Sequence, residues 1–200
     1  MKEVIEVKRD DLRELYQVLT NYPAISKEQV QNEMHKVFGE DTFKPKDITE
    51  RVKTFEDACR ELGEEHPFVS AYTAWIKHEE FDDQEDILAY MKLRIICAAL
   101  NEGWEPQFTE DEWRYYPWNI LWTEEELSEK SDEWKTDRHL ISTGEYQTDY
   151  AGLASAYSTD APSDTSATVG SRLCLKSDTL AVYCGKQFIN IWADFYLIRK

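Results

Sequence analysis

The chain has 200 residues, of which 40 are acidic and 23 are basic, so its net charge is −17. This length fits one domain, or one domain with a small appendage, and an aromatic content of 13% excludes a disordered chain. The negative charge disfavours nucleic-acid binding and anionic membrane surfaces, because both normally require a patch of Lys and Arg side chains.

The N-terminal part of the sequence predicts a small helical appendage. Apolar residues recur on one helix face from residue 12 to residue 19. An S-x-x-Q sequence that starts at Ser26 has the spacing of a capping box and predicts a second helix. Residues 40–47 are polar and contain a proline, which suits a boundary. We therefore predict a helical N-terminal appendage over 1–45 and a main domain over 46–200.

The main domain begins with helices, and the longest of them is the expected centre of the core. Thr54 precedes one short amphipathic stretch, and Pro67 is placed as in the first turn of another. The longest helix is expected to end near Asn101. Its second half, Leu93–Leu100, is apolar almost all round apart from one arginine. Such a helix is typical of a core centre rather than a surface.

The pattern changes after residue 104. Sequences of the T-x-x-E type start at Thr109 and Thr123, and each predicts a helix start. The residues between them, 113–122, have no helical period and contain Pro117. We expect this stretch to be irregular or extended.

The last third of the chain predicts a small antiparallel sheet. Residues 138–176 are rich in small residues with interspersed Leu, Ile and Val, and they favour one hairpin that pairs 148–158 with 166–176. Ser177 caps a final helix that we expect to pack across the sheet. The predicted fold class is α+β, with a helical N-terminal two-thirds, a small antiparallel β-hairpin or sheet near 138–176 and a C-terminal helix packed on it.

The acidic residues are unevenly distributed. Residues 101–150 hold 14 acidic and 4 basic side chains, a local net charge of −10, whereas residues 151–200 hold 4 acidic and 5 basic side chains. This field favours a basic protein partner through long-range attraction. Alternatively, the charge only keeps the protein in solution. We expect a protein partner, no nucleic acid and no membrane, and the oligomeric state stays open.

The four cysteines fit buried apolar positions better than a disulfide framework. None belongs to a C-x-x-C pair, and Cys59, Cys97 and Cys184 have apolar neighbours. No apolar run reaches the length of a signal peptide or a membrane span. The expected compartment is therefore reducing, with the cytoplasm as the default.

No familiar catalytic or metal-binding motif occurs in the sequence. H-E-x-x-H, G-x-S-x-G, G-x-G-x-x-G and the P-loop pattern are all absent. The nearest metal-like cluster, residues 78–83, has adjacent acids that diverge around a helix end. Acidic runs such as Glu124–Glu126 fit helix starts. We expect no enzymatic activity, no metal and no cofactor; a hydrolase of unrecognised type is an alternative.

Three basic residues stand in apolar surroundings. Arg94 lies in the apolar half of the longest helix, so its guanidinium requires a partner, which we expect to be an acid of residues 101–133. Arg172 and Lys176 share one face of the last predicted strand with Cys174. Either both pair with acidic residues inside the fold, or they form a small anion-binding pocket.

The segment 104–122 is the strongest candidate for a binding surface, because Trp and Tyr dominate interface hot spots and also stack on sugars. Its aromatic side chains could instead form a satellite core beneath an irregular loop. The alternatives are therefore packing, a protein-binding surface, or a cleft for a sugar or another small molecule. The candidate binding residues are Trp113, Tyr115, Tyr116, Trp118, Trp122, Arg172 and Lys176.

Several segments together carry a family resemblance: Asp47–Gly63, Lys92–Pro106, Tyr115–Trp118, and Gly170–Ser177 with Gly185–Phe188. On these residues the chain resembles a family of uncharacterised proteins that is frequent in Bacteroidales genomes and in their phages and prophages. The likeness covers roughly residues 47–200. It implies a phage or mobile-element setting, and it implies no catalytic residues.

The leading expectation is a non-enzymatic protein-interaction or accessory protein of a phage or mobile element. The alternative is a ligand-binding module, with carbohydrate as one ligand class, built on the aromatic segment Trp113–Trp122. A mimic of DNA charge is a further alternative, and it requires acids spaced like phosphates on one face.

Overall fold

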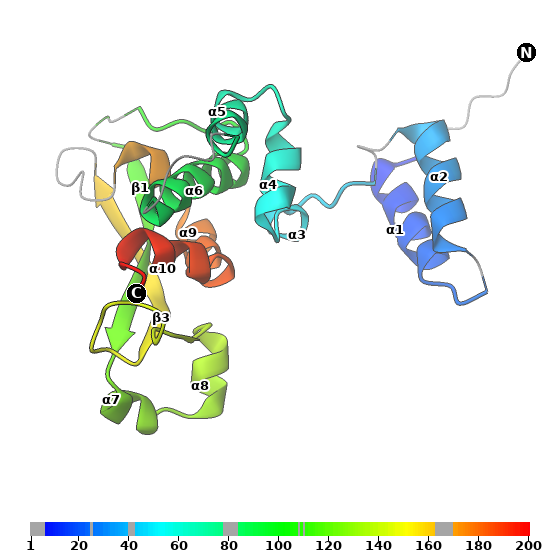
Figure 1. Cartoon of the computed structure of the whole chain (residues 1–200). Helices are drawn as coiled ribbons and strands as arrows, with labels where there is room; N and C mark the ends of the chain where they lie inside the picture. Colours follow the sequence, from blue (N-terminus) through cyan, green and yellow to red (C-terminus); the bar gives the residue numbers. More distant parts are fainter. Residues whose placement is uncertain are drawn as a thin grey trace, which may run out of the picture. The chain divides into compact units, whose positions relative to one another are not determined.

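The computed structural model describes residues 7–24, 26–39, 43–77, 84–107, 109, 111–162 and 170–200. The chain divides into two compact units, Met1–Asp47 and Ile48–Lys200. Both units are drawn in Figure 1.

The N-terminal unit is a pair of helices with little core. The Ser26 hydroxyl accepts a hydrogen bond from the Gln29 N–H at 3.4 Å, which confirms the predicted cap. Tyr16 stacks on Phe43 with ring centroids 4.6 Å apart. All of the first helix is described, and none of its residues is buried. The helices are α1 (Arg9–Thr20) and α2 (Lys27–Phe38).

The second unit has an α+β fold, which confirms the predicted class. Helices come first in the chain, and the strands follow, with further helices between and after them (Figure 1). Its helical elements are α3 (Ile48–Arg51), α4 (Phe55–Leu62), α5 (Pro67–Trp75), α6 (Glu85–Asn101), α7 (Glu124–Ser128), α8 (Asp132–Asp137), the 3₁₀ helix η2 (Ser171–Leu173), α9 (Asp178–Gln187) and α10 (Ile189–Tyr196). Its strands are β1 (Trp113–Trp122), β2 (Ile141–Ser142) and β3 (Gly152–Pro162).

The apolar second half of α6 is the centre of the core, as predicted. Leu93, Ile95, Ile96 and Leu100 are completely buried. α4, α5, α10 and η2 all pack against α6. Because this part of the helix is apolar on every side, it is stable only when neighbours cover every side.

The sheet is antiparallel, with the strand order β1-β3-β2. β1 pairs with β3 along its whole length, so that Trp113 lies opposite Pro162 and Trp122 lies opposite Gly152. α9 packs against both β1 and β3. The expectation that the C-terminal helical segment covers the sheet is therefore confirmed.

The strand pairing differs from the predicted hairpin. β3 overlaps the predicted strand 148–158, but its long partner is β1, in the segment expected to be irregular or extended. Residues 171–173 of the predicted partner strand form η2 instead, and Leu175 makes an isolated bridge to Tyr115. Residues 166–169 of that prediction lie outside the described residues. A proline inside β1 is compatible with its position at the sheet edge.

Most predicted helix starts are confirmed, and one is wrong. Thr54 and Thr123 each form a complete capping box, and Pro67 stands in the first turn of α5. Thr109 does not begin a helix, since β1 follows at once. The Glu112 carboxylate accepts instead from the Gln107 N–H at 2.9 Å. The single final helix expected after residue 177 is divided into α9 and α10 at residue 188.

Asn101 fixes the end of α6 to a distant part of the chain. Its side-chain amide donates to the Cys174 carbonyl at 2.9 Å and accepts from the Lys176 N–H at 3.0 Å. The residue is only 6% exposed. Glu102 and Gly103 then have φ values of 49° and 84°, so the chain turns sharply after the helix. The amide therefore joins α6 to the segment between η2 and α9.

Asn101→Ala should lower the free energy of unfolding by about 2–4 kcal/mol, because a buried carbonyl and a buried N–H lose their partner together. Asn190→Ala is the matched control, since Asn190 is exposed in α10. Urea unfolding of both variants measures the difference. Equal stability of the two variants would show that the amide bridge contributes nothing to the fold.

Candidate functional site

β1 distributes the predicted aromatic binding residues over different environments. Tyr116 is only 4% exposed, whereas Trp113 is 53% exposed and Trp118 is 45% exposed. The register with β3 shifts between Trp118 and Asn119, which is the mark of a β-bulge. The bulge changes which side chains face outward. The aromatic segment is therefore no continuous surface.

Tyr115 and Trp122 are engaged within the fold. Tyr115 exchanges backbone hydrogen bonds with Leu175, at 3.0 and 2.8 Å. The Trp122 ring lies edge-on to Trp134 of α8, with centroids 5.1 Å apart, and the Lys130 ammonium lies 5.0 Å from the Trp122 centroid. These contacts fasten the two ends of β1, and they leave Trp113 and Trp118 as the exposed tryptophans of the strand.

Trp118 lines an apolar groove of about 370 Å³. Tyr196, at the end of α10, contributes a second exposed ring, since it is 43% exposed. Leu121 and Leu153 come from β1 and β3. We call this feature the Trp118 groove, and its lining residues are Pro117, Trp118, Asn119, Leu121, Leu153, Tyr196 and Leu197.

The groove lies where α10 ends and no longer covers the sheet. α9 lies close to β1: a Cβ placed on Gly185 would approach the Pro117 Cβ to 3.0 Å. α10 follows after the break at Phe188 and ends at Tyr196. The apolar faces of β1 and β3 beyond that point are therefore left partly open.

Asn119 contributes an amide side chain to the lining of the groove. Neither its amide nitrogen nor its amide oxygen has a hydrogen-bond partner among the described residues, and both atoms are withdrawn from solvent. The amide oxygen lies near Gly185, at 3.6 Å from the position of an added Cβ. Because these atoms face α9, the accessible lining of the groove is almost entirely apolar.

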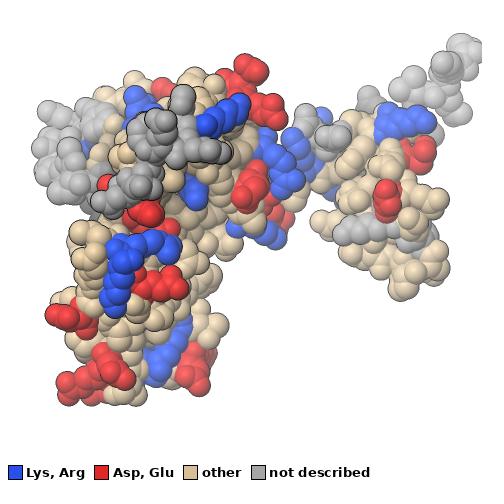
Figure 2. Space-filling model, viewed as in Figure 1, with Lys and Arg blue, Asp and Glu red and all other residues tan. Residues whose placement is uncertain are grey.

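Acidic side chains surround the end of the molecule at which β1 stops. α7 begins two residues after Trp122, and Glu124, Glu125 and Glu129 are exposed on it or just after it. Asp132 and Glu133 are exposed at the start of α8. Figure 2 shows acidic side chains on the part of the surface formed by α7 and α8. The exposed acids of α7 and α8 therefore follow the C-terminal end of β1, the strand that contributes Trp118 to the groove.

Arg114 is a buried cation that sequence reasoning did not identify. It stands in β1 between two exposed or half-exposed aromatic residues, and none of its surface is exposed. Burial raises the pKa of the Cys174 thiol to about 11, against the lowering effect of the Arg114 charge. Cys174 is consequently a thiol at neutral pH rather than a nucleophilic thiolate.

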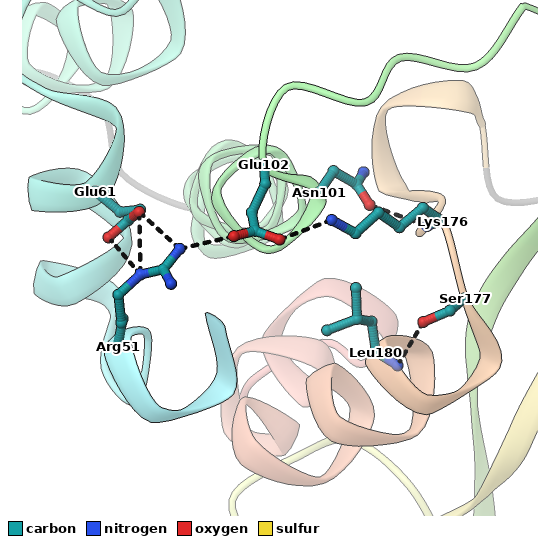
Figure 3. Close-up of polar contacts among 7 residues, drawn as sticks. All are labelled: Arg51, Glu61, Asn101, Glu102, Lys176, Ser177 and Leu180. Carbon is teal, nitrogen blue, oxygen red and sulfur yellow. Dashed lines mark hydrogen bonds and ion pairs between the residues drawn. The ribbon is translucent and has the colours of Figure 1, made fainter. Parts of the chain in front are cut away.

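Lys176 belongs to an ion-pair network rather than to an anion-binding surface. Its ammonium lies 2.8 Å from the Glu102 carboxylate, and Arg51 reaches the same carboxylate at 2.8 Å and Glu61 at 3.1 Å. Figure 3 shows how Glu102 stands between the two cations. The network connects α3, α4, the end of α6 and the segment before α9. For Lys176, this arrangement matches the expected pairing with the acidic third quarter of the chain.

Arg94 has a different partner from the one expected. Its guanidinium carbon lies 4.1 Å from the centroid of Phe68 and 5.6 Å from that of Tyr90. We expected an acid of residues 101–133 to neutralise Arg94, and this expectation is wrong for the described residues. The contacts of the Arg94 guanidinium there are cation–π contacts with aromatic rings. Arg172 lies over the same Phe68 ring, at 5.8 Å. It stands on η2 and therefore not on a strand face shared with Lys176.

The described part of the chain contains no group of three or more His, Cys, Asp or Glu side chains arranged to hold a metal ion. The candidate cluster 78–83 lies outside the described residues. His66 has a structural contact, because its Nδ1 accepts a hydrogen bond from the Phe68 N–H at 3.2 Å and caps α5. All four cysteines are free thiols.

No protein-family model matches the chain, and neither a curated protein nor a solved structure matches it. Among the helices of the described residues, none combines the length and apolar character that crossing a membrane requires.

The ion-pair network should make stability depend on pH through Glu102. Hydrogen bonds from Lys176 and then from Arg51 lower the pKa of Glu102 in the folded state. Its contribution is therefore present above the ordinary glutamate pKa and is lost as the pH falls through the lowered value. Because the side chain is 39% exposed, solvent screening limits the contribution to about 1 kcal/mol or less.

Glu102→Gln should accordingly destabilise the protein at pH 7 and approach wild-type stability below about pH 4. Urea unfolding across this pH range measures the effect. Glu64→Gln is the control, because Glu64 is exposed and no ion pair to it is seen among the described residues. A Glu102→Gln deficit that stays constant with pH would contradict the role of the network.

Proposed function

We propose that this protein is a non-enzymatic binding protein that holds an apolar side chain of a basic protein partner in the Trp118 groove. The observation that carries the proposal is the groove itself, in which Trp118 and Tyr196 are both exposed beside apolar side chains. Exposed aromatic residues in a concave apolar site are typical anchors of protein interfaces. The absence of familiar catalytic motifs from the sequence supports a binding role.

The chemistry of the groove favours a peptide side chain over a carbohydrate. A sugar presents many hydroxyl groups, and its recognition needs several polar side chains around an aromatic platform. The Trp118 groove supplies the platform, but the amide atoms of Asn119 are withdrawn from solvent. A leucine, phenylalanine or similar side chain needs no such partners. The carbohydrate alternative is therefore supported only by the exposed Trp118.

Charge complementarity indicates that the partner is basic. Residues 101–150 carry a net charge of −10, from 14 acidic and 4 basic side chains, and they include all of β1, α7 and α8. A basic segment would be attracted to the exposed acids of α7 while its apolar residue enters the groove. A second copy of this chain is disfavoured as the occupant, because two chains of charge −17 repel one another.

The setting that we propose is a phage or another mobile element. It is supported only by the family resemblance of roughly residues 47–200, and it would make the protein an accessory factor that acts on a host or phage protein.

Selection from a display library of random linear peptides tests the proposal. We expect enriched peptides to combine Lys or Arg with a large apolar residue. Trp118→Ala should weaken binding of an enriched peptide about tenfold or more, as expected for a central aromatic anchor. Trp113→Ala is the matched control, because Trp113 is equally exposed on β1 but does not line the groove. Isothermal titration calorimetry measures both variants.

Three results would contradict the proposal. Enriched peptides without basic residues would remove the charge argument. Peptide binding that Trp118→Ala leaves unchanged would show that the groove is not the site. Binding on a glycan array that Trp118→Ala abolishes, with no peptide enriched, would establish the carbohydrate alternative instead.

A further inference from the structure

Two guanidinium groups share one aromatic ring in the second unit. The guanidinium carbons of Arg94 and Arg172 lie 4.1 and 5.8 Å from the Phe68 centroid. They are consequently no more than about 10 Å apart, which is about one Debye length at 0.1 M ionic strength. Two positive charges at this separation repel one another unless an anion lies between them.

The described residues provide no such anion. Arg94 Nε is buried without a hydrogen-bond partner, and neither arginine makes an ion pair there. This arrangement contrasts with Arg51 and Lys176, which both bind Glu102. Among the described residues no acid neutralises these two arginines, and a bound anion would do so.

A pocket of about 340 Å³ opens at this place. Phe68, Trp104 and Pro106 form part of its wall, and Arg172 contributes a guanidinium group. Asn101 also lines the pocket, but its amide is already bonded to Cys174 and Lys176. Its volume is at the lower end of the range for small-molecule sites. Glu105 also lines the pocket, and it makes no ion pair with Arg172. We call this feature the Phe68 pocket.

We infer that the Phe68 pocket binds a small molecule in which a carboxylate or phosphate is attached to a flat ring. Arg172 is exposed, so its guanidinium is available for bidentate hydrogen bonds to the anionic group. The positive charge of Arg94, which also lies over the Phe68 ring, adds to the electrostatic attraction for the anionic group. Trp104, which also lines the pocket, provides an aromatic side chain against which a flat ring packs, whereas the Phe68 ring already carries the two guanidinium contacts.

The start of α5 adds to the same preference for an anion. His66 and Pro67 line the pocket, and they form the N-terminal end of a nine-residue helix, where the helix dipole is positive. His66 Nδ1 accepts from the Phe68 N–H, so its Nε2 carries the ring proton and can donate a hydrogen bond.

This site is independent of the Trp118 groove. The two sets of lining residues have no member in common. Arg172 was proposed from the sequence as part of an anion site with Lys176, but Glu102 already neutralises Lys176. In the Phe68 pocket Arg172 is the lining arginine, and Arg94 contacts the same Phe68 ring without lining the pocket. Loss of one binding activity without the other distinguishes the two proposals.

Titration with four probes tests the inference: phenyl phosphate, inorganic phosphate, phenol and benzylamine. We expect phenyl phosphate to bind more tightly than inorganic phosphate, and phenol and benzylamine not to bind. Arg172→Gln should weaken phenyl phosphate binding about tenfold or more. Arg60→Gln is the matched control, because Arg60 is an exposed arginine of α4 that does not line the pocket. Calorimetry gives the affinities, and circular dichroism verifies that each variant is folded.

Phe68→Leu is a second variant, since it keeps an apolar side chain and removes the aromatic face. It should also weaken phenyl phosphate binding. Equal affinities for phenyl phosphate and inorganic phosphate would overturn the ring part of the inference. Three results would overturn the whole inference. They are no binding of either phenyl phosphate or inorganic phosphate, phenyl phosphate binding that Arg172→Gln leaves unchanged, and benzylamine binding as tight as that of phenyl phosphate.

Discussion

The apolar second half of α6 imposes the main constraint on this protein, because it must be shielded from water on every side. α4, α5, α10 and η2 provide that shield, and Leu93, Ile95 and Ile96 are left with no exposed surface. The end of the helix then determines what lies around it. Asn101 holds the segment between η2 and α9, and the turn that follows places Trp104 at the Phe68 pocket. The position of Arg172 therefore depends on the same helix.

Local features of the sequence predict most of the helices. The hydroxyl groups of Thr54 and Thr123 cap helices within a few residues, so their roles are visible in short sequence windows. The all-round apolar character of Leu93–Leu100 likewise predicted the core. Thr109 has the same T-x-x-E spacing, but it does not begin a helix, because the chain enters β1 at Trp113. Tertiary pairing outweighs a local cap there.

Non-local features could not be predicted in the same way. β1 and β3 are far apart in the sequence. Apolar and polar residues do not alternate regularly along β1, and the strand contains Pro117, so its sequence does not indicate that it pairs with β3. The aromatic segment was recognised as a candidate, but which tryptophan faces solvent depends on the bulge after Trp118. The partner of Arg94 also depends on tertiary structure, since Phe68 belongs to another helix. A buried charge signals that a partner exists without saying whether it is an acid or an aromatic ring.

The Phe68 pocket is lined by Ala98 and Asn101 of α6, and Tyr196 of the Trp118 groove stands on α10, which packs against α6. Both candidate sites therefore depend on α6, which we expect to be the most protected part of the fold. Native-state hydrogen exchange measures that protection directly. The amides of Leu93–Leu100 should be the slowest in the chain and should exchange only through global unfolding, whereas those of α1, which has no buried residue, should exchange far faster. Exchange of the Leu93–Leu100 amides as fast as that of α1 would contradict the account.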